Sequence, residues 1–379
     1  MSFCFLHSSD LHLGRRYANM AEAPDSNLRG RLIEARYSVL GRLAAAARAA
    51  GARHILLAGD TFDTPTPSPQ LVRQTLAAMA EDPDLSWWIL PGNHDNLREA
   101  EPLWDTITRT AAPNIHALTE PTPHCLDQDR NIWLLPCPVS WRAEAGDPTQ
   151  ALDRMQTPEG ACRIGLAHGG ISDFTGQGAA IAPDRDRRAD LGYLALGDWH
   201  GRMEVSARVH YCGTPEQDRF KHNRRGVALA VRLDGAAPPD VREIETGQFL
   251  WAERVLDLTP HQDMAAAMAQ MLAPDDAHRD ILLRIVAQGW ATLSDQHDLA
   301  QAAGTHAPAY GYFELRTRDL GTQYDAGDLD EIDHAGALRH AAQTLKSAFE
   351  DTSQSESTRK VAADALARLY AYTREDTTR

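Results

Sequence analysis

Five short polar blocks punctuate this sequence, and each follows directly on a run of apolar residues. In chain order they are Asp10-Leu-His12, Gly59-Asp60-Thr-Phe-Asp63, Gly92-Asn93-His94-Asp95, His168-Gly-Gly and Gly197-Asp198-Trp-His200. Apolar runs of this length suit buried strands, and ligand sites of open α/β sheets lie at the carboxyl ends of strands. The repeated pattern therefore predicts that the five blocks meet in one site.

The alternation of short apolar runs with helical stretches predicts an α/β fold. The clearest helix is expected over residues 28–50, where apolar residues recur on one face and Gly51 supplies a C-terminal stop. A second helix is expected over residues 69–81, with Ser68 as its N-cap. These helices would flank the strands that carry the polar blocks.

With 379 residues the chain exceeds the size at which one core keeps growing, so we expect more than one domain. Residues 1–247 are predicted to form the catalytic domain, 248–333 a smaller α+β capping domain, and 334–379 a helical C-terminal tail. The expected elements of the smaller domain are strands at 250–257, 280–287 and 312–317 and a helix at 264–272.

The sequence predicts a protein with free cysteine thiols and without a membrane-spanning segment. No apolar run approaches about 18 residues, and a charged residue at Asp10 interrupts any secretory signal, so we expect a cytoplasmic location. The five cysteines form no C-x-x-C pair, which favours free thiols. The formal net charge of −15 lacks the overall basic character usual in nucleic-acid binders, although a local surface could still be positive.

The residue types in the blocks are those that bind transition metals. Carboxylate, amide oxygen and imidazole nitrogen suit Mn, Fe and Zn, and such donors at neighbouring strand ends can hold two ions a few Å apart. Asp60 is the predicted bridging ligand, because a carboxylate can bind two cations and an imidazole cannot. Any one block by itself is more often a turn former, but five in the same context favour the metal site.

The block at residues 92–95 offers two kinds of chemistry. Asn93 presents an amide oxygen as a ligand. His94 has a better use as a general acid, because a free imidazole near neutral pKa can protonate a leaving oxygen. Asp95 or Asp63 could orient that imidazole.

These motifs together resemble the calcineurin-like metallophosphoesterase superfamily. More narrowly, the segments at residues 9–14, 195–201 and 211–216 resemble the SbcD-type DNA repair nucleases. The similarity covers about residues 1–250 and implies a core of two packed mixed β-sheets flanked by helices. It also implies two divalent metal ions as cofactors and hydrolysis of a phosphoester.

One position departs from the SbcD pattern. Asp198-Trp-His200 stands where those nucleases have His-x-His, so a carboxylate replaces a neutral ligand. The added oxygen donor favours manganese. The resulting Gly-Asp-Trp-His-Gly motif resembles a bacterial clade of manganese-dependent single-strand DNA endonucleases, encoded with repair helicase and ligase genes.

The resemblance assigns each ligand to an ion. One ion would lie among Asp10, His12, Asp60 and His200, and the other among Asp60, Asn93, His168 and Asp198. Asp198 could instead act through a water molecule. His94 would be the general acid that protonates the leaving oxygen.

Several basic and aromatic residues could hold a substrate. Arg15, Arg16 and Tyr17 follow shortly after the first block, so we expect the arginines to bind phosphate and Tyr17 to stack a base. Two further basic clusters are Arg185, Arg187 and Arg188, and Arg219, Lys221, His222, Arg224 and Arg225. Trp199 could either fix its loop or stack a base.

Besides the hydrolysis of small phosphoesters or cyclic nucleotides, three functions remain open from the sequence. The leading one is a manganese-dependent nuclease that cuts single-stranded DNA endonucleolytically in repair, with DNA, a repair helicase and a ligase as partners. The second is an SbcD-like duplex-end exonuclease that works with an ABC-type ATPase. The third is a non-catalytic scaffold with the same fold. A homodimer is compatible with each of them.

Overall fold

The computed structural model describes residues 2–18, 20, 27–141, 146–171, 180–273, 278–323 and 336–377. The chain divides into two compact units, which we call the first unit, up to Trp251, and the second unit, from Ala252 onward. The predicted boundary between residues 333 and 334 lies outside the described residues.

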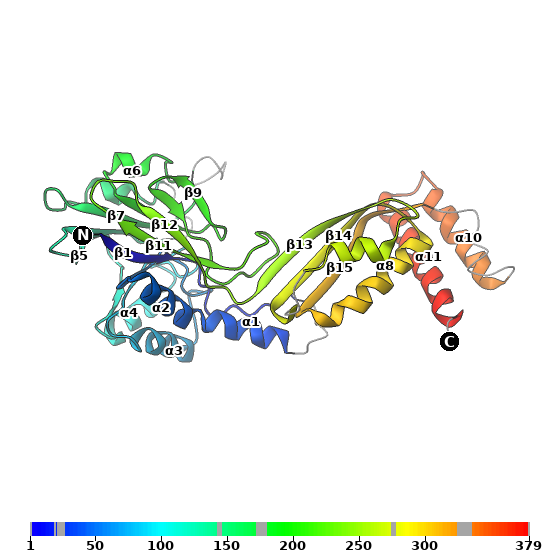
Figure 1. The fold of residues 1–379 in the computed structure, drawn as a ribbon, viewed down its shortest axis with the longest axis horizontal. Helices are drawn as coiled ribbons and strands as arrows, with labels where there is room; N and C mark the ends of the chain where they lie inside the picture. The colour runs from blue at the N-terminus through cyan, green and yellow to red at the C-terminus, as the bar shows by residue number, and fades with distance from the viewer. Residues whose placement is uncertain are drawn as a thin grey trace. The chain divides into compact units, whose positions relative to one another are not determined.

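The first unit contains two six-stranded sheets (Figure 1). One has the order β12-β11-β1-β2-β3-β4 and comprises β1 (Phe3–Ser8), β2 (His54–Leu57), β3 (Ser86–Ile89), β4 (Ile115–Ala117), β11 (Val227–Leu233) and β12 (Asp240–Glu245). The other has the order β5-β6-β7-β8-β10-β9 and comprises β5 (His124–Asp127), β6 (Ile132–Cys137), β7 (Cys162–His168), β8 (Tyr193–Gly197), β9 (Met203–Ser206) and β10 (Val209–Tyr211).

Both sheets are mixed. In the first, β1 to β4 run parallel, and β11 pairs antiparallel with β1 and with β12. In the second, β6, β7, β8 and β10 run parallel, and β5 and β9 lie antiparallel at the edges. The structure thus confirms the predicted α/β fold with two mixed sheets flanked by helices.

The helices of the first unit largely follow the sequence pattern. The predicted helix over residues 28–50 is two helices, α1 (Leu28–Tyr37) and α2 (Val39–Ala50), which meet at Ser38. Gly51 ends α2 in the left-handed conformation, as predicted. The Ser68 side chain caps α3 (Pro69–Ala80), also as predicted. The remaining elements are α4 (Glu101–Thr110), the short α6 (Arg185–Arg188) and the 3-10 turn η1 (Gln150–Asp153).

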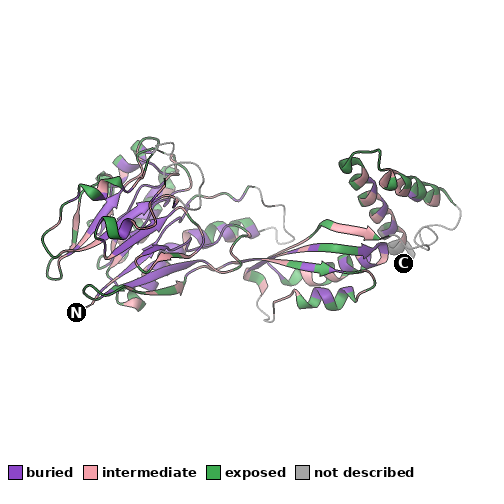
Figure 2. Ribbon diagram, turned by 90° about the horizontal axis from the view of Figure 1, so that it is seen from above, coloured by how far each residue is buried: buried purple, intermediate pink, exposed green. Residues whose placement is uncertain are grey.

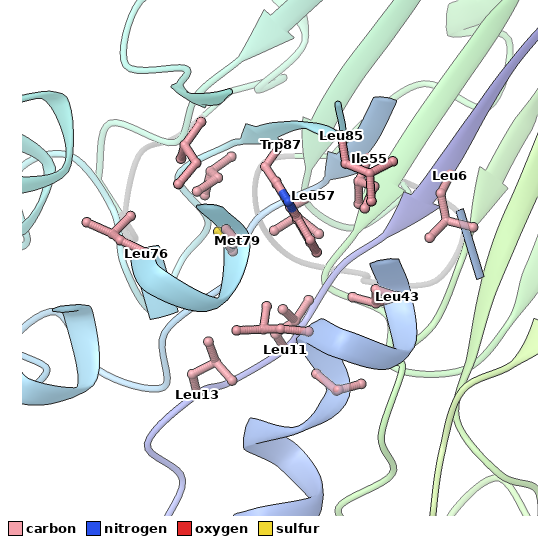
Figure 3. Close-up of a cluster of buried hydrophobic side chains, with 14 of the residues drawn as sticks. Leu6, Leu11, Leu13, Leu43, Ile55, Leu57, Leu76, Met79, Leu85 and Trp87 are labelled. Carbon is pink, nitrogen blue, oxygen red and sulfur yellow. The ribbon is translucent and has the colours of Figure 1, made fainter. Parts of the chain in front are cut away.

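Alternate residues of the strands supply two separate cores, because successive side chains of a strand point to opposite faces. Leu6, Ile55 and Trp87 face the helices and pack with residues of α2, α3 and α4, as Figure 3 shows for part of this cluster. Phe5 and Leu56 face the other way and pack against residues of the second sheet. The inner strands of the two sheets therefore consist mainly of buried residues, which Figure 2 draws in purple.

The second unit is built on a three-stranded sheet of β13 (Leu250–Leu258), β14 (Ile281–Thr292) and β15 (Tyr312–Gln323), the first of which starts within the first unit. β14 and β15 run parallel and are joined through α8 (Leu293–His306), which has a capping box of Thr292 and Asp295. The other elements are α7 (Met264–Gln270), η2 (His278–Asp280), η3 (Ala307–Ala309), α10 (Ala337–Glu350) and α11 (Glu356–Thr377). Within the described residues no helix is both long and apolar enough to cross a membrane.

A histidine of the sheet predicts how stability varies with pH. The His54 Nδ1 accepts a hydrogen bond from the Trp88 indole at 3.1 Å, and its ring lies against Phe3. Burial, and then the nearby His116, lower the pKa of His54 from 6.5 to about 4. The unfolded chain therefore binds this proton more readily, so stability is complete above about pH 6.5 and is lost as pH falls toward 4, by at most ~1.4 kcal/mol per pH unit.

Urea unfolding at pH 7.5 and pH 5, with a chelator present throughout, checks this expectation. His54→Gln should lose less stability than the wild type between the two pH values. His340→Gln, which alters an exposed histidine of α10, should keep the wild-type dependence. Equal pH dependence in the wild type and His54→Gln would show that His54 does not titrate in this way.

Candidate metal centre

The five polar blocks converge at the carboxyl ends of strands from both sheets. Asp10 and His12 follow β1, Asp60 follows β2, and His168 ends β7. Donor atoms in each of three overlapping groups lie within 4.8 Å of one another. The groups are Asp10, His12 and His200; His12, Asp60 and His94; and Asp10, Asp60 and His168. Shared members join them into one cluster, as the sequence pattern predicts.

The backbone at this cluster is strained. Asp10, His12, Asp60 and Asp198 all have positive φ, between 44° and 98°. Such a conformation costs a non-glycine residue roughly 1 kcal/mol or more, and it is retained where the surroundings enforce it. The left-handed turns redirect the chain directly after each strand, so that the side chains point toward a common centre.

Glycines let the strands of the two sheets approach closely here. A Cβ on Gly197, at the end of β8, would lie 1.9 Å from the Ala58 carbonyl oxygen and 2.8 Å from His168 Nδ1. A Cβ on Gly92 would lie 2.2 Å from Asp60 Oδ1. Neither position has room for a side chain, so these glycines set the spacing between candidate ligands.

Gly197→Ala should therefore destabilise the first unit by about 1–3 kcal/mol, because the added methyl group would clash with the Ala58 carbonyl oxygen, which is held in the adjoining sheet. It should also weaken metal binding, because His168 is displaced. Gly41→Ala is the matched control: its Cβ meets nothing within 4 Å in α2, and it should stabilise the protein by about 0.5–1 kcal/mol. Thermal unfolding and metal titration of both variants test this; a neutral Gly197→Ala would refute the close packing.

The three candidate histidine ligands present the same ring nitrogen to the centre. Each Nδ1 lies near an oxygen: His12 at 3.3 Å from Asp63, His200 at 3.5 Å from Asp218, and His168 at 2.8 Å from the Ala58 carbonyl. For His12 and His168 the oxygen at Nδ1 favours the tautomer that donates from there, which leaves the Nε2 lone pair free. At His200 the Arg219 guanidinium, which can only donate, also lies 3.2 Å from Nδ1. The Nε2 atoms face the cluster, those of His12 and His200 being 3.2 Å apart.

Among the buried side-chain atoms that lack a hydrogen-bond partner in the described part of the chain, two belong to the ligands predicted for the second ion, His168 Nε2 and Asn93 Oδ1. The Asn93 amide donates its Nδ2 to Asp198 Oδ1 at 3.1 Å, which leaves its oxygen as the unused atom. An unsatisfied buried acceptor costs about 1–3 kcal/mol unless a ligand takes it up. Both atoms are among the predicted ligands, so the donor set fits bound cations.

The charges of the cluster also fit cations. Burial raises the pKa of Asp198, and its neighbours Asp10 and Asp60 raise it further. Burial opposes the ionisation of Asp60 as well, but His168, whose Nε2 lies 3.5 Å from Asp60 Oδ2, lowers its pKa. In turn Asp60 holds the pKa of His168 above its usual value despite burial. Three carboxylates gathered in this way require positive charge nearby.

Asp60 and Asp198 occupy different places in the cluster. Asp60 is buried between His12, at 3.8 Å, and His168, which is the placement expected of a bridging ligand. Asp198 is about one-third exposed, and its carboxylate lies 3.9 Å from His168 Nε2. Its backbone N–H donates to the Asp10 carboxylate. Asp198 is thus at the edge, where it can contact an ion directly or through water.

His94 lies beside the cluster and is oriented by backbone groups. The backbone N–H of His94 donates to Asp60 Oδ1 at 2.8 Å, and the ring Nδ1 of His94 lies 2.9 Å from the carbonyl oxygen of Asp63. The Asp63 carboxylate instead faces His12 and Arg15. Asp63 is thus placed to orient the His94 ring through its backbone carbonyl.

Asp95 supports the loop and makes no described contact with the His94 ring. Its carboxylate accepts hydrogen bonds from Gly92 N at 2.7 Å and from Phe62 N at 3.0 Å. Burial, and then the charge of Asp60, raise the pKa of Asp95 to about 7. The role of Asp95 as an orienter of His94 is thus replaced by one in fixing the turn that presents Asn93.

The residues after the first block divide into a rim and an interior. Arg15 lies between Asp63 and Asp218, at 3.3 and 3.2 Å, and Arg16 is exposed. Tyr17 is buried: it accepts a hydrogen bond from Arg36 and stacks on Trp251. The expected base-stacking role of Tyr17 is therefore not supported.

The other two basic clusters also differ in whether their arginines are buried in the fold or lie near the candidate site. Arg185 is buried and bonds to the Thr149 carbonyl and to Asp153, which makes it a packing residue. Arg219 instead lies next to the metal cluster, 3.2 Å from His200 Nδ1. The third cluster is thus the one that reaches the candidate site.

Sequence reasoning missed Asp218. Its carboxylate is fully buried and faces His200, Arg15 and Arg219. Burial opposes its ionisation, but His200 and the nearby guanidinium groups of Arg36 and Arg219 hold its pKa well below the usual range. Asp218 thereby fixes the His200 ring and gathers two arginines at the rim. The signal in the sequence was a carboxylate two residues beyond the Gly-Thr-Pro-Glu segment, within a basic run.

Comparisons with known proteins bear on this geometry. A family model described as "Calcineurin-like phosphoesterase" matches residues 4–232. A solved structure titled as that of TT1561 of Thermus thermophilus is 12% identical, with a TM-score of 0.42, over 65% of this chain and all of the other. A second is 11% identical with a TM-score of 0.38 and the same coverage. TM-scores of this size do not establish a shared fold. No curated protein matches the sequence.

Proposed function

The chain belongs to the calcineurin-like phosphoesterase family, and from that premise we propose that it is a manganese-dependent phosphodiesterase that cuts single-stranded DNA endonucleolytically in repair. The family consists of metal-dependent phosphoester hydrolases that bind two divalent ions, and the candidate ligand groups are present. The substrate, the metal and the biological setting are the parts we add. The setting includes a cytoplasmic location and a repair helicase, a ligase or an ATPase as partners.

The observation that carries the proposal is the common orientation of His12, His168 and His200, whose Nε2 atoms face the buried carboxylates. Two divalent ions held there would activate water and neutralise the charge that develops on phosphorus. Asp60 would lie between the ions. His94, held at the edge by the Asp63 carbonyl, would give a proton to the leaving oxygen.

The donor set supports manganese. Three carboxylates and an amide oxygen join three imidazoles, and a set rich in oxygen with some nitrogen suits Mn²⁺ better than a thiolate or all-imidazole site would. The described residues contribute no cysteine to the candidate groups. This agrees with the Gly-Asp-Trp-His-Gly motif, in which Asp198 adds the third carboxylate.

A polyanionic substrate is supported by the side chains around the ligands. Arg15 and Arg219 both bond to Asp218, and Lys221 lies against Trp199, between two candidate ligands. Although the net charge of the chain is −15, Arg15, Arg219 and Lys221 thus form a rim of basic side chains at the site. Phosphates on either side of the scissile bond would meet these residues, as in other proteins that bind single strands.

Closed-circular single-stranded DNA offers a direct test, because it has no ends for an exonuclease. Incubation with Mn²⁺ should linearise it, Mg²⁺, Fe²⁺ and Zn²⁺ should support less cleavage, and a chelator should abolish it. Relaxed circular duplex serves as the control and should remain intact. Cleavage only of duplex ends, and only with an ATPase partner, would favour the exonuclease; no metal binding and no cleavage of any phosphodiester would favour the scaffold.

A further inference from the structure

Trp199 occupies an unusual place for a large apolar side chain. It lies between the candidate ligands Asp198 and His200, yet its side chain remains 39% exposed. Trp87 and Trp104, by contrast, are 1% and 3% exposed. Exposing an indole beside a buried ionic cluster gains nothing for folding, because the hydrophobic effect favours its removal from water. If Trp199 served only to hold its loop in place, a buried side chain would stabilise the loop more.

The ring is nevertheless held in place. The Lys221 ammonium lies over it, 4.1 Å from the centroid, and His222 contacts it edge-on at 6.0 Å between centroids. A Cβ on Gly201 would come within 2.9 Å of the indole Nε1 and 2.6 Å of His222, so glycine is needed for this approach. The indole is thus a preorganised exposed surface, with a cation on it.

The chemistry around the ring matches a nucleotide. A nucleotide combines a flat base with an anionic phosphate. Trp199 offers an indole on which the base could stack, and Lys221, in contact with that indole, offers an ammonium for the phosphate. Arg219, 3.2 Å from His200 Nδ1, adds a second cation on the side of the metal ligands. Because Trp199 is flanked by two candidate ligands, a base stacked on it would belong to a nucleotide adjoining the phosphodiester at the metal centre.

We propose that Trp199, with Lys221 and Arg219, forms a stacking subsite for the unpaired nucleobase next to the scissile phosphate. This rests on the proposed function and deepens it, because it gives the enzyme a reason to prefer single strands. A base within a duplex is already stacked on both sides and paired, so it reaches the indole only by leaving the helix. An unpaired base stacks freely and without sequence readout.

A cycle that combines a protein change with a DNA change isolates the stacking contact. The DNA is a single-stranded oligonucleotide with one abasic position, moved stepwise past the cleavage site. For the wild-type protein with Mn²⁺, removing the base beside the scissile phosphate should raise KM about 5- to 150-fold, the range expected for one stacked base. Trp199→Ala should raise KM for intact DNA by a similar factor and should lose nothing more on the abasic DNA.

Two further variants make the test specific. Trp199→Phe keeps an aromatic face and should recover most of the affinity for intact DNA. Trp141→Ala removes an indole of similar exposure, 41%, that also lies under an arginine, Arg98, and it should leave KM unchanged. The manganese content of Trp199→Ala should equal that of the wild type. Additive losses from the two changes, or an equal loss with Trp141→Ala, would overturn the subsite.

Failure of the proposed function would be seen separately. If the wild type cleaves no DNA in any metal, the nuclease assignment fails, and the subsite is then judged by fluorescence anisotropy of labelled intact and abasic oligonucleotides. Tighter binding of the intact strand by the wild type, abolished in Trp199→Ala, would still support stacking. Equal binding of both strands by the wild type would contradict it.

Discussion

Asp60→Asn is expected to lower the bound manganese from two ions to one or fewer per chain and to slow phosphodiester cleavage by at least about 1,000-fold. Asp60 is 2% exposed and lies between His12 and His168, so its carboxylate is the group best placed to bind both ions. Asparagine has the same size but offers one neutral oxygen. Metal analysis after dialysis, with cleavage of circular single-stranded DNA, gives both quantities.

A folding defect must be separated from the loss of metal, because Asp60 Oδ1 also accepts the hydrogen bond from His94 N. Thermal unfolding with and without a chelator does this. Manganese should raise the Tm of the wild type more than that of Asp60→Asn, and the two proteins should unfold at similar temperatures with the chelator. Asp82→Asn, which changes a partly exposed carboxylate paired with Arg48 outside the cluster, should behave as the wild type. Full metal occupancy in Asp60→Asn would show that Asp60 is not a bridging ligand.

His94→Ala is expected to keep both metal ions and to slow DNA cleavage by roughly 100- to 10,000-fold, the usual contribution of a general acid. The His94 ring stands at the edge of the cluster, with its centroid 4.8 Å from that of His12, and the Asp63 carbonyl fixes its Nδ1. It is also close enough to Asp60 and His12 to be a ligand instead. Manganese analysis of the variant decides between these roles, because loss of an ion would make His94 a ligand.

The leaving group gives a second test of His94. A sugar alkoxide must be protonated as it leaves, whereas a nitrophenolate leaves readily without a proton. His94→Ala should therefore reduce cleavage of bis(4-nitrophenyl) phosphate much less than cleavage of DNA. An equal reduction for both substrates would mean that His94 acts on binding or on the metals and does not donate the proton.

The sequence predicts the first unit well because its signals are local. Apolar runs mark β1, β2, β3, β7 and β8, and the polar residue after each run marks the point where the chain leaves the sheet. Ser68 and Gly51 mark helix ends through their own backbone preferences. The meeting of five blocks follows from parallel strands that end at the same level, and the structure brings them together as expected.

The errors have a common physical origin in contacts made over long sequence separations. The burial of Tyr17 depends on Arg36 and Trp251, which no local pattern connects to it. Likewise the side chain of Asp218 meets His200 only after the strands are assembled. The interruption between α1 and α2 at Ser38 was not predicted, because the helical pattern of the sequence continues across it. By contrast, α8 is absent from the predicted elements although Thr292 and Asp295 form a capping box, which is a local signal.

The central claim is that side chains distant in the sequence hold two cations around Asp60. Crystals grown with Mn²⁺ and measured at the manganese absorption edge test this most directly. The anomalous difference map should show two peaks about 3.5–4 Å apart, with Asp60 between them, His12 and His200 Nε2 at one, and His168 Nε2 and Asn93 Oδ1 at the other. A single peak, or manganese bound away from Asp60, would contradict the account.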